Sequence, residues 1–131
     1  MKQLRHNKSS VTNINYHIVF CPKYRRKVLV NGIDQRLKEV LTDIAELCGC
    51  KIKSLEVMPD HVHLFVEGVP TKAVHLIVRD LKGQSSRVLR SEFPELRSKL
   101  PNLWTRAYYC ETIGCICEET VRKYIELQKS H

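Results

Sequence analysis

The sequence lacks any long uninterrupted hydrophobic stretch. Its apolar segments are short and broken by charged residues, so none is long enough to cross a bilayer as a helix. The N-terminal segment, MKQLRHNKSS, has no apolar core of the kind that a signal peptide requires. These absences predict a cytosolic protein that does not enter the membrane.

The sequence also lacks linkers rich in glycine and serine, internal repeats and low-complexity tracts. A chain of 131 residues is long enough to bury a core without disulfides or a structural metal. We therefore expect a single domain over residues 1–131.

No C-x-x-C motif is present, although the chain has six cysteines. Two C-x-C pairs occur, at residues 48/50 and 115/117, and this spacing is a poor match to zinc ribbons. In a reducing cytosol we expect free thiols that pack as small hydrophobic side chains. A structural zinc site that combines cysteines with histidines is the alternative. The cysteines are Cys21, Cys48, Cys50, Cys110, Cys115 and Cys117.

Acidic residues are absent from the first 33 positions, which carry seven basic residues. The other 98 positions carry 15 basic and 14 acidic residues, so most of the net charge of +8 lies in the N-terminal quarter. A local basic face suits a polyanion, most often nucleic acid. A solvated edge that opposes aggregation is the alternative. The seven residues are Lys2, Arg5, Lys8, Lys23, Arg25, Arg26 and Lys27.

The hydrophobic periodicity predicts the order β-α-β-β-α-β-α. Runs rich in β-branched and aromatic residues predict strands over residues 11–21, 51–57, 61–66 and 103–111. Apolar residues at three-to-four spacing predict helices over residues 33–47, 71–91 and about 117–129, with Gly49 ending the first. The segment between Pro94 and Pro101 is predicted to be irregular. The first six elements match an α+β, ferredoxin-like fold, an antiparallel sheet with helices on one face, to which the C-terminal helix is an addition.

Two histidines, His61 and His63, lie in a predicted strand. Residues i and i+2 of a strand point to the same face, about 6.6 Å apart, so the two imidazoles can converge on one divalent cation. A His-x-His triplet is weak evidence by itself, because two histidines on one sheet face need not bind anything.

The predicted last helix carries Tyr124 and Gln128, which lie on one helix face because they are four residues apart. A single tyrosine on a helix is more often a core or interface aromatic than a catalytic group. The role of this pair therefore depends on what surrounds it.

Three segments in order carry a resemblance to a known family: residues 16–25 (YHIVFCPKYR), 56–64 (EVMPDHVHL) and 124–128 (YIELQ). Together they resemble the HUH single-tyrosine transposases, often called TnpA, of the IS-two-hundred/IS-six-hundred-five group. The resemblance covers nearly the whole chain, and the combination of M-P-D-H-V-H-L with a downstream Y-I-x-x-Q helix is highly specific.

The resemblance implies the parts of an active site. His61, His63 and Gln128 match the ligands of Mg²⁺ or Mn²⁺, and Tyr124 matches the nucleophile that forms a 5′-phosphotyrosine. It also implies cleavage and rejoining of single-stranded DNA at transposon ends with subterminal hairpins. The enzyme would be a homodimer with active sites shared between subunits, working in a prokaryotic cytoplasm in association with the nucleoid.

Two alternatives stay open. A domesticated relative would cut hairpins without moving its own element, and a non-catalytic module would only bind nucleic acid, with the histidines as bystanders. Basic residues of the first strand's end and of the second helix are candidates for contacts to DNA phosphates. They are Lys23, Arg25, Arg26, Lys27, Arg79, Lys82 and Arg87.

Overall fold

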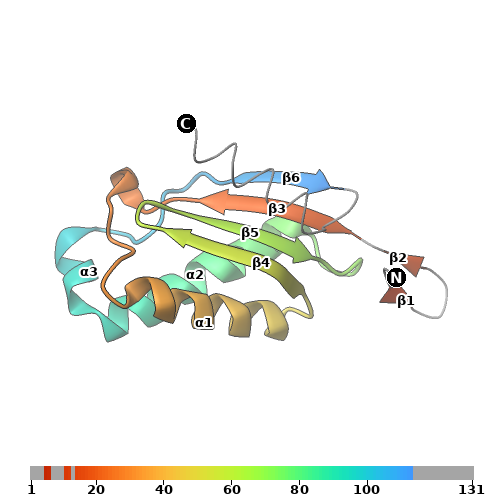
Figure 1. Cartoon of the computed structure of the whole chain (residues 1–131), viewed down its shortest axis with the longest axis horizontal. Coiled ribbons are helices and arrows are strands. Elements are labelled where there is room, and N and C mark those ends of the chain that lie inside the picture. The colour runs from red at the N-terminus through yellow and green to blue at the C-terminus, as the bar shows by residue number, and fades with distance from the viewer. Residues whose placement is uncertain (1–4, 7–10, 13, 114–131) are drawn as a thin grey trace.

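A four-stranded antiparallel sheet organises the molecule (Figure 1). The computed structural model describes residues 5–6, 11–12 and 14–113. The sheet contains β3 (Asn15–Phe20), β4 (Lys51–Met58), β5 (His61–Glu67) and β6 (Tyr109–Ile113), in the order β4-β5-β3-β6. Each neighbouring pair is antiparallel, and β3 and β5 are central. The ferredoxin-like prediction is confirmed.

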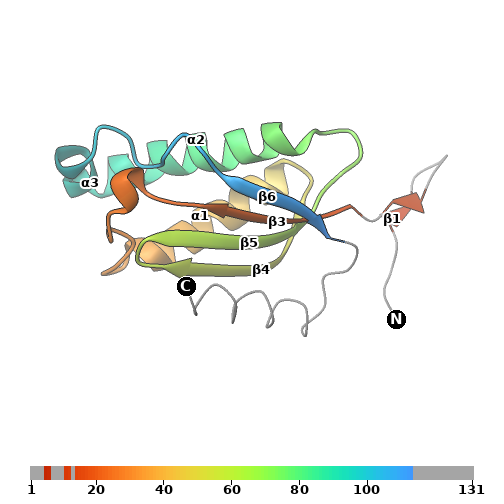
Figure 2. The same ribbon diagram turned by 90° about the horizontal axis from the view of Figure 1, so that it is seen from above.

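Two long helices, α1 (Ile33–Leu47) and α2 (Val74–Glu92), run along one face of the sheet (Figure 2). Their buried side chains form one core with alternate residues of the central strands, such as Ile18 and Leu64. Because side chains alternate along a strand, His17 and His63 point to the face away from the helices. None of the described helices is long and apolar enough to cross a membrane.

The helix α1 has the bounds that its periodicity predicts. Leu37, Leu41 and Ile44 are buried on one side. Gly49 follows the helix with a φ of +78°, a left-handed conformation that glycine adopts without steric cost. Gly32, with a φ of +94°, closes the turn before the helix.

The predicted first strand is wrong in its extent. Residues 11–12 form β2 (Val11–Thr12), which pairs with β1 (Arg5–His6) in a separate two-stranded sheet. The sheet strand β3 begins only at Asn15. After it, the basic run starts with a short 3-10 turn, η1 (Lys23–Arg25), in which Tyr24 and Arg25 have positive φ values.

The segment between α2 and β6 also differs from its prediction. The second helix begins at Val74 rather than residue 71, because residue 73 is still extended. Residues 94–99, predicted to be irregular, form the helix α3 (Pro94–Lys99), since proline fits the first helical turn, where no N–H partner is needed.

The predicted strand over residues 103–111 is wrong in its first half. The strand β6 begins at Tyr109, whereas Trp104 forms an isolated bridge with Pro22. The aromatic content of residues 103–109 reflects packing: Trp104 is buried, and its ring meets the Phe20 ring edge to face at a centroid distance of 4.6 Å.

The predicted C-terminal helix over about 117–129 lies outside the described residues, together with Cys115 and Cys117. Among the described cysteines, Cys21, Cys48 and Cys110 are free thiols.

Candidate metal centre

The strand β5 brings His61 and His63 together on the face away from the helices. Their ring centroids are 4.7 Å apart, with the rings nearly perpendicular. His63 is 3% exposed, and His61 is half-buried. The two imidazoles therefore converge as their i, i+2 spacing predicts.

A histidine on the neighbouring strand β3, His17, orients His63. Nε2 of His17 on β3 lies 3.3 Å from Nδ1 of His63, and both side chains are buried. The other ring nitrogen of His17, Nδ1, lies 3.3 Å from Oε1 of Glu111 on β6. The chain Glu111–His17–His63 crosses three adjacent strands because β3 lies between β6 and β5.

This chain of hydrogen bonds determines which nitrogens carry protons. The Glu111 carboxylate only accepts, so His17 donates to it from Nδ1–H, and Nε2 of a neutral His17 is then an acceptor. His63 must donate to that acceptor from Nδ1–H. Its Nε2 is left without a proton, with the lone pair that a metal ligand needs.

His61 is held in the same tautomer by a different group. Its Nδ1–H donates to Oδ1 of Asp60 at 2.7 Å, and Nε of Arg25 donates to Oδ2 of the same carboxylate at 3.1 Å. Burial acts to raise the pKa of Asp60, but the hydrogen bonds from His61 and Arg25 outweigh it and lower the pKa. Both His61 and His63 thus direct Nε2 away from their orienting partners.

Burial favours the neutral form of His63 and of His17. Loss of hydration, with the neighbouring His61 and His17, lowers the pKa of His63 to about 4. Burial also lowers the pKa of His17, although its hydrogen bond to Glu111 acts in the opposite direction. Neutral imidazole is the form that ligates a metal, so a pair of unprotonated Nε2 atoms fits a divalent cation.

The described part of the chain contains two of the three predicted ligands, His61 and His63. Within residues 5–6, 11–12 and 14–113, no group of three His, Cys, Asp or Glu side chains could hold a metal ion. The predicted third ligand Gln128 and the predicted nucleophile Tyr124 lie outside the described residues.

The basic candidates for DNA contacts do not form one cluster. Lys23 and Lys82 line a common pocket, whereas Arg25 is paired with Asp60. Arg79 lies 3.4 Å from Asp80. The remaining candidates are exposed: Arg26, Lys27 and Arg87.

A comparison with protein families decides the class of the protein. The family model described as "Transposase IS200 like" matches residues 10–128. The chain belongs to this family.

Relatives of this IS200-like transposase include two curated proteins. It is 38% identical over 128 residues to the ISDra2 transposase TnpA of Deinococcus radiodurans, an alignment that covers 96% of this chain and 91% of that protein. It is 36% identical over 104 residues to the transposase for insertion sequence element IS200 of Salmonella typhimurium, covering 78% of this chain and 68% of that protein.

Solved structures share the fold of the IS200-like transposase. A crystal structure of a Deinococcus radiodurans R1 protein described as a transposase matches with a TM-score of 0.78 at 36% identity, covering 95% of this chain and 98% of that one. A REP-associated tyrosine transposase bound to a REP hairpin matches with a TM-score of 0.61 at 16% identity, covering 95% of this chain and 68% of that one, which shows the fold alone.

In this IS200-like transposase, three residues that orient His61 and His63 could not be assigned a role from sequence spacing. His17 and Asp60 stand inside the motifs that carry the resemblance, but spacing gives them no role. Glu111 is an ordinary acidic residue in a strand. One signal was available: His17 interrupts the apolar run Tyr16–Phe20, where a buried histidine needs polar partners.

Proposed function

We propose that this IS200-like transposase cleaves and rejoins single-stranded DNA through a 5′-phosphotyrosine on Tyr124, with Mg²⁺ or Mn²⁺ held by His61, His63 and Gln128. The observation that supports it best is the paired orientation of the two histidines. Separate partners hold the Nδ1 of each ring, and the two ring centroids lie 4.7 Å apart. The family match over residues 10–128 includes both Tyr124 and Gln128.

The protein's own groups would carry out the covalent step. The phenolic oxygen of Tyr124 attacks the phosphorus of the scissile phosphodiester and loses its proton. The bond from phosphorus to the 3′ oxygen breaks, and the 3′ oxygen takes up a proton and leaves as a hydroxyl. Because the phosphotyrosine is again a phosphodiester, a second 3′-hydroxyl can displace Tyr124 and rejoin the strand.

A bound divalent cation would polarise a non-bridging phosphate oxygen and offset the charge that develops in the transition state. The two histidines and Gln128 would form a neutral ligand set, so the charge of the cation would not be cancelled by carboxylates. Asp60, His17 and Glu111 would keep the imidazoles in the ligating tautomer.

The substrate that we propose is a single strand with a subterminal hairpin at a transposon end. The REP-associated transposase of the same fold is bound to a REP hairpin. The excess of basic residues in the first 33 positions supplies charge for a polyanion. Pairing of two chains into a homodimer with shared active sites belongs to the same proposal.

Covalent capture tests the chemistry. Hairpin-bearing single strands from the DNA that flanks the gene are incubated with the protein and Mg²⁺ and separated under denaturing conditions. A 5′-phosphotyrosine retains the downstream fragment, so a 3′ label should stay with the protein and a 5′ label should not. Chelation should abolish the adduct, and Mg²⁺ or Mn²⁺ should restore it.

The variant Tyr124→Phe should lose the adduct completely while it binds the strand with unchanged affinity. Tyr109→Phe is the matched control, because the Tyr109 ring lies 5.8 Å from the His17 ring and could be mistaken for the nucleophile. An adduct that persists in Tyr124→Phe, or that disappears only in Tyr109→Phe, would contradict the assignment of Tyr124.

A further inference from the structure

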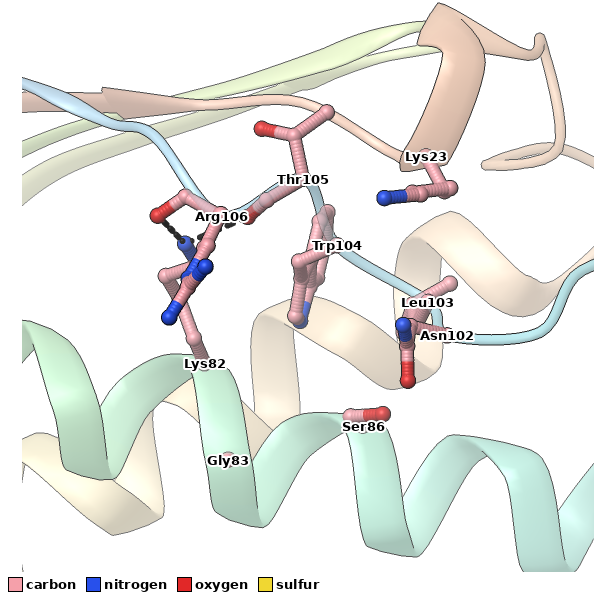
Figure 3. A pocket seen from close by; sticks show the side chains of 9 residues that line it. All are labelled: Lys23, Lys82, Gly83, Ser86, Asn102, Leu103, Trp104, Thr105 and Arg106. Carbon is pink, nitrogen blue, oxygen red and sulfur yellow. Dashed lines mark hydrogen bonds between the residues drawn. The ribbon is translucent and has the colours of Figure 1, made fainter.

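A pocket that carries basic side chains opens at the end of the sheet where β3 leaves it (Figure 3). It lies between η1, α2 and the segment that precedes β6, and it has a volume of about 510 Å³. This volume is within the range of ligand sites in proteins. The lining residues are Lys23, Lys82, Gly83, Ser86, Asn102, Leu103, Trp104, Thr105 and Arg106.

The charge of the pocket is of one sign. Lys23, Lys82 and Arg106 come from three different segments, and the nine lining residues include no carboxylate. Ser86, Asn102 and Thr105 add neutral hydrogen-bonding groups. A concave site that gathers cations without counter-charges in its lining favours an anionic ligand.

The Lys82 ammonium is held in place by the backbone. It donates to the carbonyl oxygen of Thr105 at 2.6 Å and to that of Arg106 at 3.0 Å (Figure 3). An ammonium has three N–H donors, so it can accommodate a further acceptor in the pocket. Burial lowers the pKa of Lys82, and a bound anion would favour its charged form.

The wall of the pocket is fixed before any ligand binds. The backbone N–H of Lys23 donates to the carbonyl oxygen of Leu103 at 2.8 Å. The N–H of Thr105 donates to the carbonyl oxygen of Cys21 at 2.9 Å, and Nε1 of Trp104 donates to Oγ of Ser85 at 3.0 Å. Little conformational entropy would be lost on binding, because these groups are already ordered.

The pocket lies at the same end of the sheet as His61. Phe20, the last residue of β3, pairs with Val62, which follows His61 in β5. The N–H of Thr105 in the pocket wall donates to the carbonyl oxygen of Cys21, the residue that follows β3. The pocket is lined by α2, on the helix side of the sheet, whereas the histidines face away from the helices.

We propose that this pocket binds a backbone phosphate of single-stranded DNA, with Lys23, Lys82 and Arg106 around the phosphate. The proposal rests on the proposed function only in taking DNA as the ligand. It requires neither the metal nor Tyr124, so binding can be tested without cleavage.

Trp104 makes the test direct, because it is the only tryptophan of the chain and lies in the pocket wall. The full-length protein is titrated with a short oligothymidylate in the presence of a chelator, and tryptophan fluorescence is followed. The variants Lys23→Gln and Arg106→Gln remove one cation each. Lys82 is not replaced, since it supports the pocket wall. The control Lys99→Gln removes the same charge from an exposed residue of α3 that is not among the lining residues.

We expect a saturable change in Trp104 fluorescence, and binding on the order of fivefold weaker in each pocket variant. The slope of log K against log salt should shrink by about 0.7 for each lost phosphate contact. Lys99→Gln should keep the wild-type affinity and slope.

Three results would overturn the proposal. Wild-type affinity and salt slope in both pocket variants would show that Lys23 and Arg106 do not contact a phosphate. An equal loss of affinity in Lys99→Gln would show that only the net charge of the protein matters. Saturable binding of thymidine monophosphate or inorganic phosphate, with no fluorescence change from the oligonucleotide, would assign the pocket to a free phosphate compound. If the pocket binds DNA but no covalent adduct forms, the proposed chemistry fails and the phosphate site stands.

Discussion

At the scale of single residues, the proposed metal centre depends on which ring nitrogen of each histidine carries the proton. Glu111 determines this for His63 through His17, over two hydrogen bonds of 3.3 Å each. Asp60 determines it for His61 over 2.7 Å. Two separate carboxylates thus orient the two proposed ligands, as partners of metal-binding histidines commonly do.

Replacing Glu111 should therefore weaken metal binding without touching a ligand. In Glu111→Ala, His17 can carry its proton on Nε2 and donate to His63, which moves the His63 proton to Nε2 and blocks ligation. We expect Mn²⁺ affinity to fall about 10-fold to 100-fold, measured by the electron paramagnetic resonance of free Mn²⁺.

Glu111→Gln is the matched control, since its amide oxygen can still accept from His17, and it should lose much less affinity. Nitrogen-15 chemical shifts of His63 report the tautomer directly. A folded Glu111→Ala protein with wild-type Mn²⁺ affinity and an unchanged His63 tautomer would refute the relay.

The metal-free protein should lose stability as the pH falls from 6.5 to about 4, the unfolded and folded pKa values of His63. In this window the unfolded chain binds a proton that folded His63 excludes, so the free energy of unfolding rises with pH. The contribution is complete above pH 6.5 and is on the order of 3 kcal/mol.

Urea unfolding of the metal-free protein at several pH values measures this dependence. His63→Gln removes this titrating group and should make the curve shallower in the same window, with the remainder due to other groups such as His17. A wild-type curve as flat as that of the variant would show that His63 does not stay neutral in the fold.

At the scale of elements, the glycine that follows α1 and the glycine inside α2 affect stability in opposite directions. Gly49 ends α1 with a φ of +78°, which a side chain adopts only with strain, whereas Gly83 lies inside α2 with open space around it. Glycine therefore fits position 49 better than other residues do. At position 83 glycine lowers stability, because the unfolded chain has more conformational entropy at a glycine and loses it when the helix forms.

Alanine substitutions should show this difference in sign. Gly49→Ala should lower the free energy of unfolding by about 1 kcal/mol, and Gly83→Ala should raise it by about 0.5–1 kcal/mol. Urea unfolding at neutral pH measures both, and equal denaturant slopes would show that the unfolded state is unchanged. Destabilisation by both substitutions would contradict the account of Gly83.

At the scale of the whole molecule, the sheet separates two tasks. One face packs α1 and α2 into the core, and the other face carries His61, His63 and their partners on the central strands. Central strands are paired on both sides, so their backbone is held more firmly than an edge. The proposed metal centre would gain preorganisation from that position.

Sharing of sites between two chains is tested by mixing inactive subunits. His61→Ala lacks a proposed ligand, and Tyr124→Phe lacks the proposed nucleophile. Coexpression with different tags gives mixed dimers in which one site combines an intact His61 with an intact Tyr124. Random pairing mixes half of the dimers and repairs one of two sites in each, so about a quarter of wild-type activity is expected.

Covalent capture of labelled DNA measures this activity in the mixture and in each variant alone. Each single variant should give none. A mixed preparation as inactive as its parts would place the whole site within one chain.

The sequence by itself determined the parts that depend on near neighbours. Side-chain periodicity is a local property of helices and strands, so α1, β4, β5 and the fold class followed from it within a few residues. The common face of His61 and His63 followed from the two-residue repeat of a strand. The family resemblance and the family match agree over nearly the whole chain.

Tertiary structure alone decided which groups surround the histidines. His17 and His63 are 46 residues apart, and His17 and Glu111 are 94 apart. They meet only because β3 pairs with β5 and β6 in one particular register, and a shift by one residue would turn His17 into the core. That register is set by the packing of the whole sheet against α1 and α2. Local pattern therefore identified the two histidines, and the assembled sheet decided how they are held.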